Sequence, residues 1–207
     1  MSTAEAINFS APEHNPSEPV RIRADSDTGL AILEEIKHSP PLIAVEAESE
    51  GADSGHRQNL AHMPDELVER RLRKKLFIAT DNLKSTPVEA VVGAASAEQP
   101  IHVPMDHVID AQGFMSWMGR APGVKKTRST DEGYITEPSI DTIRHYAALD
   151  TRIPPIKSME MFIQPDGKVF FSNDNDGSHR LAAAVVKGQE SVPTYSLRIH
   201  RLPEDII

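Results

Sequence analysis

The chain has 207 residues, of which 39% are hydrophobic and 26% charged, with a formal net charge of −9 and no cysteine. The lack of cysteine excludes a disulfide scaffold, a zinc ribbon, an iron–sulfur protein and a thiol nucleophile. No segment approaches the roughly 18 apolar residues of a membrane span, and no basic-then-apolar leader is present. We therefore expect a cytoplasmic protein without a membrane span. The acidic total argues against a general nucleic-acid coat.

Negative charge is concentrated in the first 60 residues, which contain eleven Asp and Glu against four Lys and Arg, a net charge of −7. Such a composition, with five prolines, buries too little apolar surface to offset the entropy of ordering. The sequence therefore predicts an acidic, Pro-rich and mostly disordered tail over residues 1–60. Residues 30–36, with helical apolar spacing, and residues 41–45, typical of a short strand, are exceptions. They either fold against the body or a partner, or belong to a plain solubilising leader.

Residues 63–76 predict an amphipathic helix. Pro64 suits a first helical turn, and Asp65 and Glu66 suit the positive end of the helix dipole. Five Lys and Arg between residues 70 and 75 give this helix a basic flank. They either bind a phosphate or an acidic partner, or form a solvated face that pairs with nearby acids. The predicted apolar stripe comprises Met63, Leu67, Val68, Leu72 and Leu76.

The main domain is predicted to begin at residue 100. Residues 61–99 combine the basic helix with a linker, because residues 93–99 are rich in Ala, Ser, Gly and Glu. Residues 100–207 have the pattern of a compact α/β unit, with helices and strands in alternation. Its predicted elements are a strand within residues 101–109, a helix over residues 138–150, and a hairpin whose strands, 158–163 and 168–172, flank the turn Pro165-Asp166-Gly167.

Residues 112–134 predict a long, basic, mobile loop. They contain four glycines and one proline, and a loop of that length inside a domain is usually functional or disordered. Clustered Lys and Arg bind phosphates without reading base sequence, so the basic residues of this loop are DNA-binding candidates. They are Arg120, Lys125, Lys126 and Arg128.

The most informative segment covers residues 173–180 and reads Asn-Asp-Asn-Asp-Gly-Ser-His-Arg. A predicted strand ends there in a tight glycine turn, and a helix follows that Gly188 is suited to end. The first amides of such a helix point outward, and the helix dipole adds positive charge beside them. An anion such as a phosphate fits this place. The predicted phosphate-binding residues are Gly177, Ser178, His179 and Arg180.

A simpler interpretation of the same segment stays open at this point. Asp176 and Ser178 are both good helix-capping residues, and His179 and Arg180 are able to pair with nearby acids. A single short glycine turn does not decide between capping and anion binding.

The order of the elements is similar to that of the ParB/sulfiredoxin superfamily. The resemblance rests on Ile153-Pro-Pro-Ile156, the hairpin, Gly177-Ser-His-Arg180, an Ala-rich helix, Gly188 and Val192-Pro-Thr-Tyr195, and covers roughly residues 101–200. Sulfiredoxins have a Gly-Cys-His-Arg turn that holds ATP phosphates, ParB proteins an arginine-rich version that holds CTP phosphates, and free-serine kinases an Asp-Gly-His-His-Arg version. The resemblance implies an α/β (α+β) domain with a small mixed sheet and flanking helices. It also implies ATP or another nucleotide at the turn.

Two differences from these families reduce the number of subgroups that the chain resembles. Ser178 stands where sulfiredoxins have their cysteine, which excludes sulfinic-acid repair. No helix-turn-helix segment follows the motif, so we do not expect a chromosome-partition ParB. The remaining resemblance is to stand-alone domains such as the plasmid fertility-inhibition proteins of the Osa type. These resemble ParB-like nucleases, hydrolyse ATP, cleave DNA and block transfer through a type IV secretion channel, which implies DNA and a type IV secretion or coupling protein as partners.

Three functions follow from the resemblance, and each needs different groups. A nucleotide-dependent hydrolase acting on DNA needs a divalent ion such as Mg²⁺, for which Asp174 and Asp176 supply carboxylate oxygens. A phosphotransferase needs a carboxylate base, for which Glu160 is the candidate. A non-catalytic protein-binding module tolerates the loss of the turn's basic side chains. The predicted catalytic residues are His179, Arg180, Asp176 and Glu160.

Overall fold

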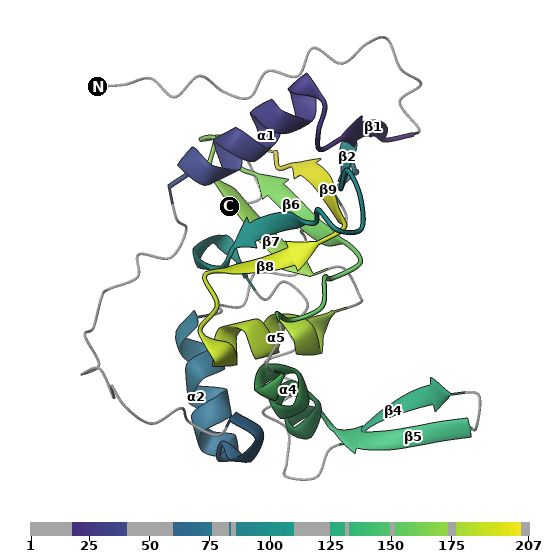
Figure 1. Ribbon diagram of the computed structural model, residues 1–207. Helices are drawn as coiled ribbons and strands as arrows, with labels where there is room; N and C mark the ends of the chain where they lie inside the picture. The colour runs from purple at the N-terminus through teal and green to yellow at the C-terminus, as the bar shows by residue number, and fades with distance from the viewer. Residues whose placement is uncertain are drawn as a thin grey trace.

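The computed structural model describes residues 18–40, 60–75, 83, 86–109, 125–130, 133–149, 152–173 and 177–203. They form a mixed α+β structure, with α1 at the top of Figure 1, α2, α4 and α5 at the bottom, and the strands other than β4 and β5 between them. The β4–β5 pair lies at the bottom, beside α4. In chain order the elements are β1 (Val20–Arg23), α1 (Asp27–His38), η1 (Leu60–His62), α2 (Asp65–Lys75), β2 (Ala90–Gly93), β3 (Ile101–Pro104), η3 (Met105–His107), β4 (Lys125–Thr130), β5 (Gly133–Pro138), α4 (Ser139–Ala148), β6 (Met159–Ile163), β7 (Val169–Asn173), α5 (Ser178–Lys187), β8 (Ser191–Thr194) and β9 (Ser196–Arg201).

The central element is a five-stranded mixed sheet with the strand order β1-β2-β9-β6-β7. β1 runs parallel to β2 and β9 parallel to β6, whereas the β2–β9 and β6–β7 pairs are antiparallel. β3 and β8 form a separate two-stranded sheet, as do β4 and β5. The expected mixed sheet with flanking helices is therefore present.

The β6–β7 hairpin confirms the prediction from turn chemistry. Gly167 adopts φ +83°, a left-handed conformation that a glycine takes without a Cβ penalty. The turn is closed by a hydrogen bond from Lys168 N to Asp166 Oδ1 at 3.1 Å, and the Lys168 ammonium lowers the pKa of the Asp166 carboxyl. The strands pair in register from Met159 opposite Asn173 to Ile163 opposite Val169.

The two faces of this hairpin belong to different apolar clusters. Met161 and Phe171 lie in the main core, which also contains the buried side of α5. Phe162 and Phe170 point to the other face, because side chains alternate along a strand, and their rings stack with centroids 5.2 Å apart. This second cluster comprises Leu83, Ile109, Phe162, Phe170 and Leu202.

The described part of the N-terminal region, residues 18–40, is folded rather than disordered. Residues 30–36 lie in α1 and fold against the body, which was one of the two alternatives for this segment. We also expected the domain to begin at residue 100, yet the sheet takes β1 and β2 from before that boundary. Ile32 and Ile36 of α1 are 2% and 3% exposed within the main core. The acidic composition predicts that the entropy cost of ordering this segment exceeds the gain from burial. Burial of these apolar side chains instead offsets that cost. The strand expected over residues 41–45 lies outside the described residues.

The other helices confirm the apolar patterns. On α2, Val68 and Leu72 are fully buried, and Arg71 donates to the carbonyl oxygen of Val186 in α5 at 2.7 Å. α5 packs against α4 as well as α2. Gly188 ends α5 with φ +71°, as its position predicted. In the part of the chain that the structure describes, no helix is long and apolar enough to cross a membrane.

The two edges of the five-stranded sheet are covered to different extents. At the β7 edge, Ile109 N donates to Phe171 O at 2.7 Å, and Ser39 Oγ accepts a hydrogen bond from Val169 N at 3.3 Å. β1, at the opposite edge, pairs with β2 on its inner side. β7 is therefore hydrogen-bonded on both of its sides along part of its length, to β6 on the inner side and to Ile109 and Ser39 on the outer side.

The basic loop expected over residues 112–134 is in part a hairpin. Residues 125–130 form β4, which pairs in register with β5 from Lys125 opposite Pro138 to Thr130 opposite Gly133. Ladder hydrogen bonds between the strands therefore replace the irregular backbone expected there. Residues 110–124 lie outside the described part of the chain.

Candidate functional site

The candidate site is the turn that connects β7 to α5. Gly177 is the N-cap of α5 and adopts φ +98° and ψ 3°, and no side chain among the described residues forms a capping hydrogen bond there. Ser178 is the first residue of α5 rather than its N-cap, so the interpretation of Ser178 as the capping residue is wrong. The first helical hydrogen bond runs from Leu181 N to Gly177 O at 2.8 Å. The amides of residues 178–180 therefore precede the helical ladder, where helices receive anions.

Gly177 is required by sterics as well as by its dihedral angles. A Cβ on Gly177 would lie 2.7 Å from Cγ2 of Ile156 and 3.0 Å from its Cγ1. Ile156 is fully buried, and its backbone N donates to Pro193 O at 2.8 Å, so it is held from β8. The Pro-Pro-Ile segment thus passes directly beneath the turn, and only glycine allows this approach.

Two further contacts fix the side chains of the turn. Asn173, fully buried at the end of β7, donates from Nδ2 to Ser178 Oγ at 2.7 Å. Arg180 donates from Nη1 to the carbonyl oxygen of Pro155 at 2.5 Å, which holds its guanidinium beside the Ile153–Ile156 segment. His179 and Arg180 are both half-buried. The structure therefore brings all four predicted phosphate-binding residues together with the Pro-Pro-Ile segment.

Glu160 lies elsewhere. It faces the side of the sheet opposite to Met161 and the α5 core, because it shares a face with Phe162. Its Oε2 lies 2.5 Å from His200 Nε2, and its Oε1 lies 3.5 Å from Arg198 Nε. The carboxylate therefore has two partners from β9, and the described contacts do not join it to the turn.

The remaining predicted residues are only partly described. Asp174, Asp176 and Arg120 lie outside the described residues. Lys125, Lys126 and Arg128 belong to β4, and the β4–β5 pair forms its own sheet. Within the described ranges, no three His, Asp or Glu side chains come together as a potential metal site.

Sequence reasoning missed Asn173, Ile156 and His200 as parts of these arrangements. Asn173 belongs to the predicted turn segment, but its hydrogen bond to Ser178 depends on how the turn folds back, which the sequence does not show. The contact of Ile156 with Gly177 joins segments that no local pattern connects. For His200, the alternation of Leu197 and Ile199 with polar residues already predicts which face of the strand the histidine occupies.

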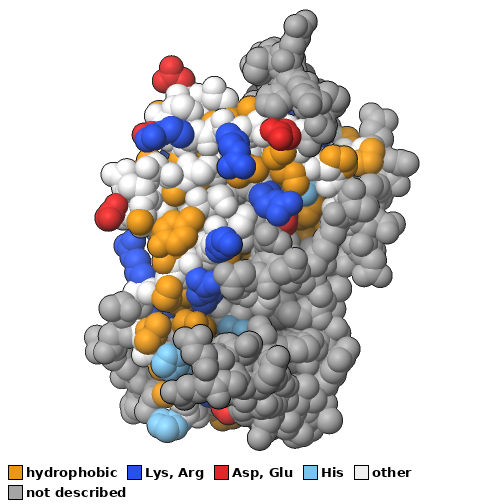
Figure 2. Space-filling model, turned by 90° about the vertical axis from the view of Figure 1, so that its right-hand side faces the viewer, with side chains coloured by type: hydrophobic (Ala, Val, Ile, Leu, Met, Phe, Trp, Pro, Cys, Tyr) orange, Lys and Arg blue, Asp and Glu red, His pale blue; other side chains and the backbone are white. Residues whose placement is uncertain are grey.

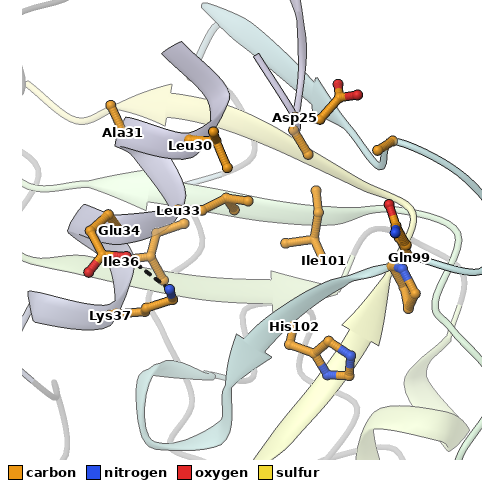
Figure 3. Close-up of a pocket in the computed structure, with 13 residues that line it drawn as sticks. Asp25, Leu30, Ala31, Leu33, Glu34, Ile36, Lys37, Gln99, Ile101 and His102 are labelled. Atoms are coloured by element: carbon orange, nitrogen blue, oxygen red, sulfur yellow. Dashed lines mark hydrogen bonds and ion pairs between the residues drawn. The ribbon is translucent and has the colours of Figure 1, made fainter. Parts of the chain in front are cut away.

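A separate cleft of about 630 Å³ lies between α1 and residues 95–102 (Figure 3). Leu33 and Ile101 line it, and Leu30, 55% exposed, lies at the same side of α1. At one end, Lys37 Nζ lies 2.9 Å from Glu34 Oε2, and its hydrogen bond, together with that of His38, lowers the pKa of Glu34. None of the predicted site residues lines this cleft.

No protein-family model, no curated protein and no solved structure matches the chain.

Proposed function

We propose that this chain binds the phosphates of ATP or another nucleotide at Gly177–Arg180, hydrolyses the nucleotide, and binds or cleaves DNA. In this proposal residues 100–207 contain a ParB/sulfiredoxin-like domain. The setting that the resemblance suggests is inhibition of transfer through a type IV secretion channel, with a secretion or coupling protein as partner.

The observation that carries the proposal is the left-handed Gly177 pressed against Ile156 at the start of α5. Such a glycine lets the backbone turn sharply and presents the first amides of the helix to an anion. Ser178 and Arg180 add a hydroxyl and a guanidinium, and guanidinium–phosphate hydrogen bonds are short and charge-assisted. The contacts with Asn173 and Pro155 hold these two side chains in place before any ligand binds.

The choice between a hydrolase and a free-serine-kinase type of phosphotransferase depends on Glu160. A kinase base must lie beside the phosphate and its acceptor. Glu160 instead contacts His200 and Arg198 on the far face of the sheet, which favours nucleotide binding without Glu160 as the base. Bound Mg²⁺ would neutralise phosphate charge, and Asp174 and Asp176 remain its proposed carboxylate ligands from the sequence.

Two observations bear on the DNA part of the proposal. Several Lys and Arg side chains lie on the side of the molecule seen in Figure 2, interspersed with hydrophobic ones. Arg23, Arg198 and Arg201 each lie within 4 Å of a carboxylate, which offsets part of the positive charge of these three side chains. We therefore expect DNA binding to be weak, insensitive to sequence and strongly weakened by salt.

The test is nucleotide binding and hydrolysis with ATP, CTP and ADP, with and without Mg²⁺, on the full chain and on Arg180→Ala. Loss of a hydrogen bond to a charged group costs about 1.5–3 kcal/mol, so we expect roughly 10- to 150-fold weaker binding. Arg21→Ala is the control, because Arg21 is an exposed arginine on β1, far along the sheet from β7.

Thermal melting establishes whether Arg180→Ala stays folded, since the variant also loses the contact with Pro155. Unchanged nucleotide affinity in a folded Arg180→Ala variant would reject the turn as the phosphate site. The chain would then be better described as a protein-binding module.

A further inference from the structure

Two buried histidines each join a carboxylate to a main-chain carbonyl of the N-terminal part of the fold. In the first, the His200 ring lies between Thr86 and Glu160. Nδ1 lies 2.9 Å from Thr86 O, and Nε2 lies 2.5 Å from Glu160 Oε2. The side chains of His200 and Glu160 are 4% and 12% exposed, and the ring stacks on Phe162 with centroids 4.8 Å apart. This ring therefore holds the residue that precedes the β2 segment.

The second histidine repeats this arrangement on another part of the fold. Nδ1 of His107 lies 2.7 Å from Asp106 Oδ1, and Nε2 lies 3.0 Å from Ser39 O. The His107 side chain is 4% exposed and meets Phe171 edge to face. Ser39 directly follows α1, so this ring holds the end of the β1–α1 segment.

The atoms around each ring determine how many protons it needs. A carbonyl oxygen only accepts hydrogen bonds, and so does an ionised carboxylate. A neutral imidazole has one N–H, so it can satisfy only one of its two neighbours. Both contacts of each ring therefore require a second proton, carried either on the ring or on the carboxyl group.

We propose that His107 and His200 are proton-dependent clasps that fasten residues 18–40 and 86–93 to the rest of the sheet. When the second proton leaves, the single remaining N–H stays on the carboxylate, because a charged acceptor makes the stronger hydrogen bond. The contact that is lost is the one to Ser39 O or Thr86 O. Raising the pH therefore loosens the N-terminal segments.

The direction of this pH dependence follows from the hydrogen-bond count. The clasped state needs one more proton per histidine than the state in which the ring contacts only the carboxylate. Proton binding therefore favours the clasped state, so the attachment strengthens as the pH falls and weakens as the pH rises. For each clasp the equilibrium between attached and detached segments changes by up to about tenfold per pH unit.

Within the described part of the chain, a small set of charged groups lies near the two rings. Beyond Glu160, the His200 site has Arg198 at 3.5 Å from the carboxylate, and Glu89 precedes β2 opposite His200 and lies 3.5 Å from Arg201 Nε. Around His107, Asp106 is the direct partner. The neighbouring charged residues there are Lys37 and His38 at the end of α1, and Lys168, which pairs with Asp166, beside Val169.

The first measurement is made on the full chain labelled with ¹⁵N-histidine. Imidazole nitrogen shifts, recorded between about pH 6 and pH 8, report which ring nitrogens carry a proton. We expect the carbonyl-facing nitrogen of His107 and of His200 to carry a proton at the lower pH and to lose it as the pH is raised, whichever group of the pair holds the second proton. A carbonyl-facing nitrogen whose protonation does not change over this range would overturn the proposal, without any variant being needed.

The second measurement uses amide hydrogen exchange, corrected for its intrinsic pH dependence. We expect protection in β1 and α1 to fall more than in β6 as the pH rises. In the double variant Glu160→Gln and Asp106→Asn, an amide donates to the ring nitrogen, so a neutral ring keeps both contacts and this extra fall disappears.

The matched control is Glu34→Gln. Glu34 contacts the exposed His38 at 3.0 Å within α1, and this contact does not join α1 to another element. This variant should keep the pH dependence of the wild type. An equal dependence in wild type and double variant, or none in the wild type, would reject the clasps.

Discussion

The two edge strands of the central sheet are built in opposite ways. All five residues of β7 are buried, because Phe170 and Phe171 enter different apolar clusters on its two faces. β1 alternates between half-buried and exposed residues, with Arg21 and Arg23 facing solvent. β7 is thus a core strand that happens to lie at an edge, whereas β1 depends on its ladder with β2, on α1 and on the contacts of Ser39. The position of a strand in a sheet therefore does not determine how strongly that strand is held.

The largest difference should appear when one apolar side chain is removed from each edge. Phe171→Ala leaves a cavity in the core and should cost roughly 3–5 kcal/mol of unfolding free energy. Ile22→Ala on β1 removes a half-buried side chain and should cost roughly 1–2 kcal/mol. Denaturant unfolding measures both values. Equal losses would contradict the contrast between the edges.

The role of α1 in holding β1 can be measured separately. Ile32→Ala removes a side chain that is 2% exposed and should cost roughly 2–5 kcal/mol. Leu30→Ala, on the same helix but 55% exposed, should change stability by less than about 0.5 kcal/mol. If Ile32→Ala were as mild as Leu30→Ala, α1 would be an appendage and the predicted acidic tail would be the better description.

The two glycines that flank β7 separate backbone strain from steric contact. Both have positive φ, but a Cβ on Gly167 meets nothing within 4 Å, whereas one on Gly177 meets Ile156. Gly167→Ala should therefore cost roughly 1–2 kcal/mol, and Gly177→Ala roughly 1–3 kcal/mol more. Thermal or denaturant unfolding gives the difference. Combining Gly177→Ala with Ile156→Ala should cost less than the sum of the two single changes, because the contact is then removed.

The smallest effect belongs to the charged end of β1. Arg23 donates to both oxygens of Asp25, at 2.9 and 2.7 Å, and these hydrogen bonds lower the pKa of the Asp25 carboxyl. Any stability from this pair is present above the unfolded pKa and lost as the pH falls through the lowered folded value. Arg23→Gln should raise the pKa of Asp25 in a carboxyl NMR titration while leaving stability nearly unchanged, since exposed ion pairs contribute little.

Local signals in the sequence predicted the parts of the fold that form between neighbouring residues. The turn at Gly167, the alternation along β6 and the glycine at each end of α5 are encoded within a few positions, and the structure agrees. The candidate turn belongs to the same class, since Gly177 to Arg180 are contiguous. Its four residues are therefore grouped by the sequence alone, whereas phosphate binding by them stays a prediction.

Long-range pairings were not predictable in this way. β1 pairs with β2 almost 70 residues later, and no short pattern records which strand a four-residue segment will join. The acidic composition around β1 also predicts disorder, and the few apolar residues that become buried are too weak a signal to reverse that prediction. Glu160 is a candidate base because it is a carboxylate. Its contact in the fold, His200, lies 40 residues later on β9, and this contact could not be predicted from the sequence around Glu160.

The covered edge of β7 has a consequence for how copies of the chain meet. Exposed N–H and C=O groups on a buried-type, apolar strand form a template for pairing with another chain and for aggregation. Ser39 Oγ accepts the outward N–H of Val169, and Ile109 N occupies the outward carbonyl of Phe171. Part of the edge of β7, the strand most prone to self-association, is thereby blocked, and β1 at the other edge has the exposed charged residues Arg21 and Arg23, which disfavour pairing with another strand.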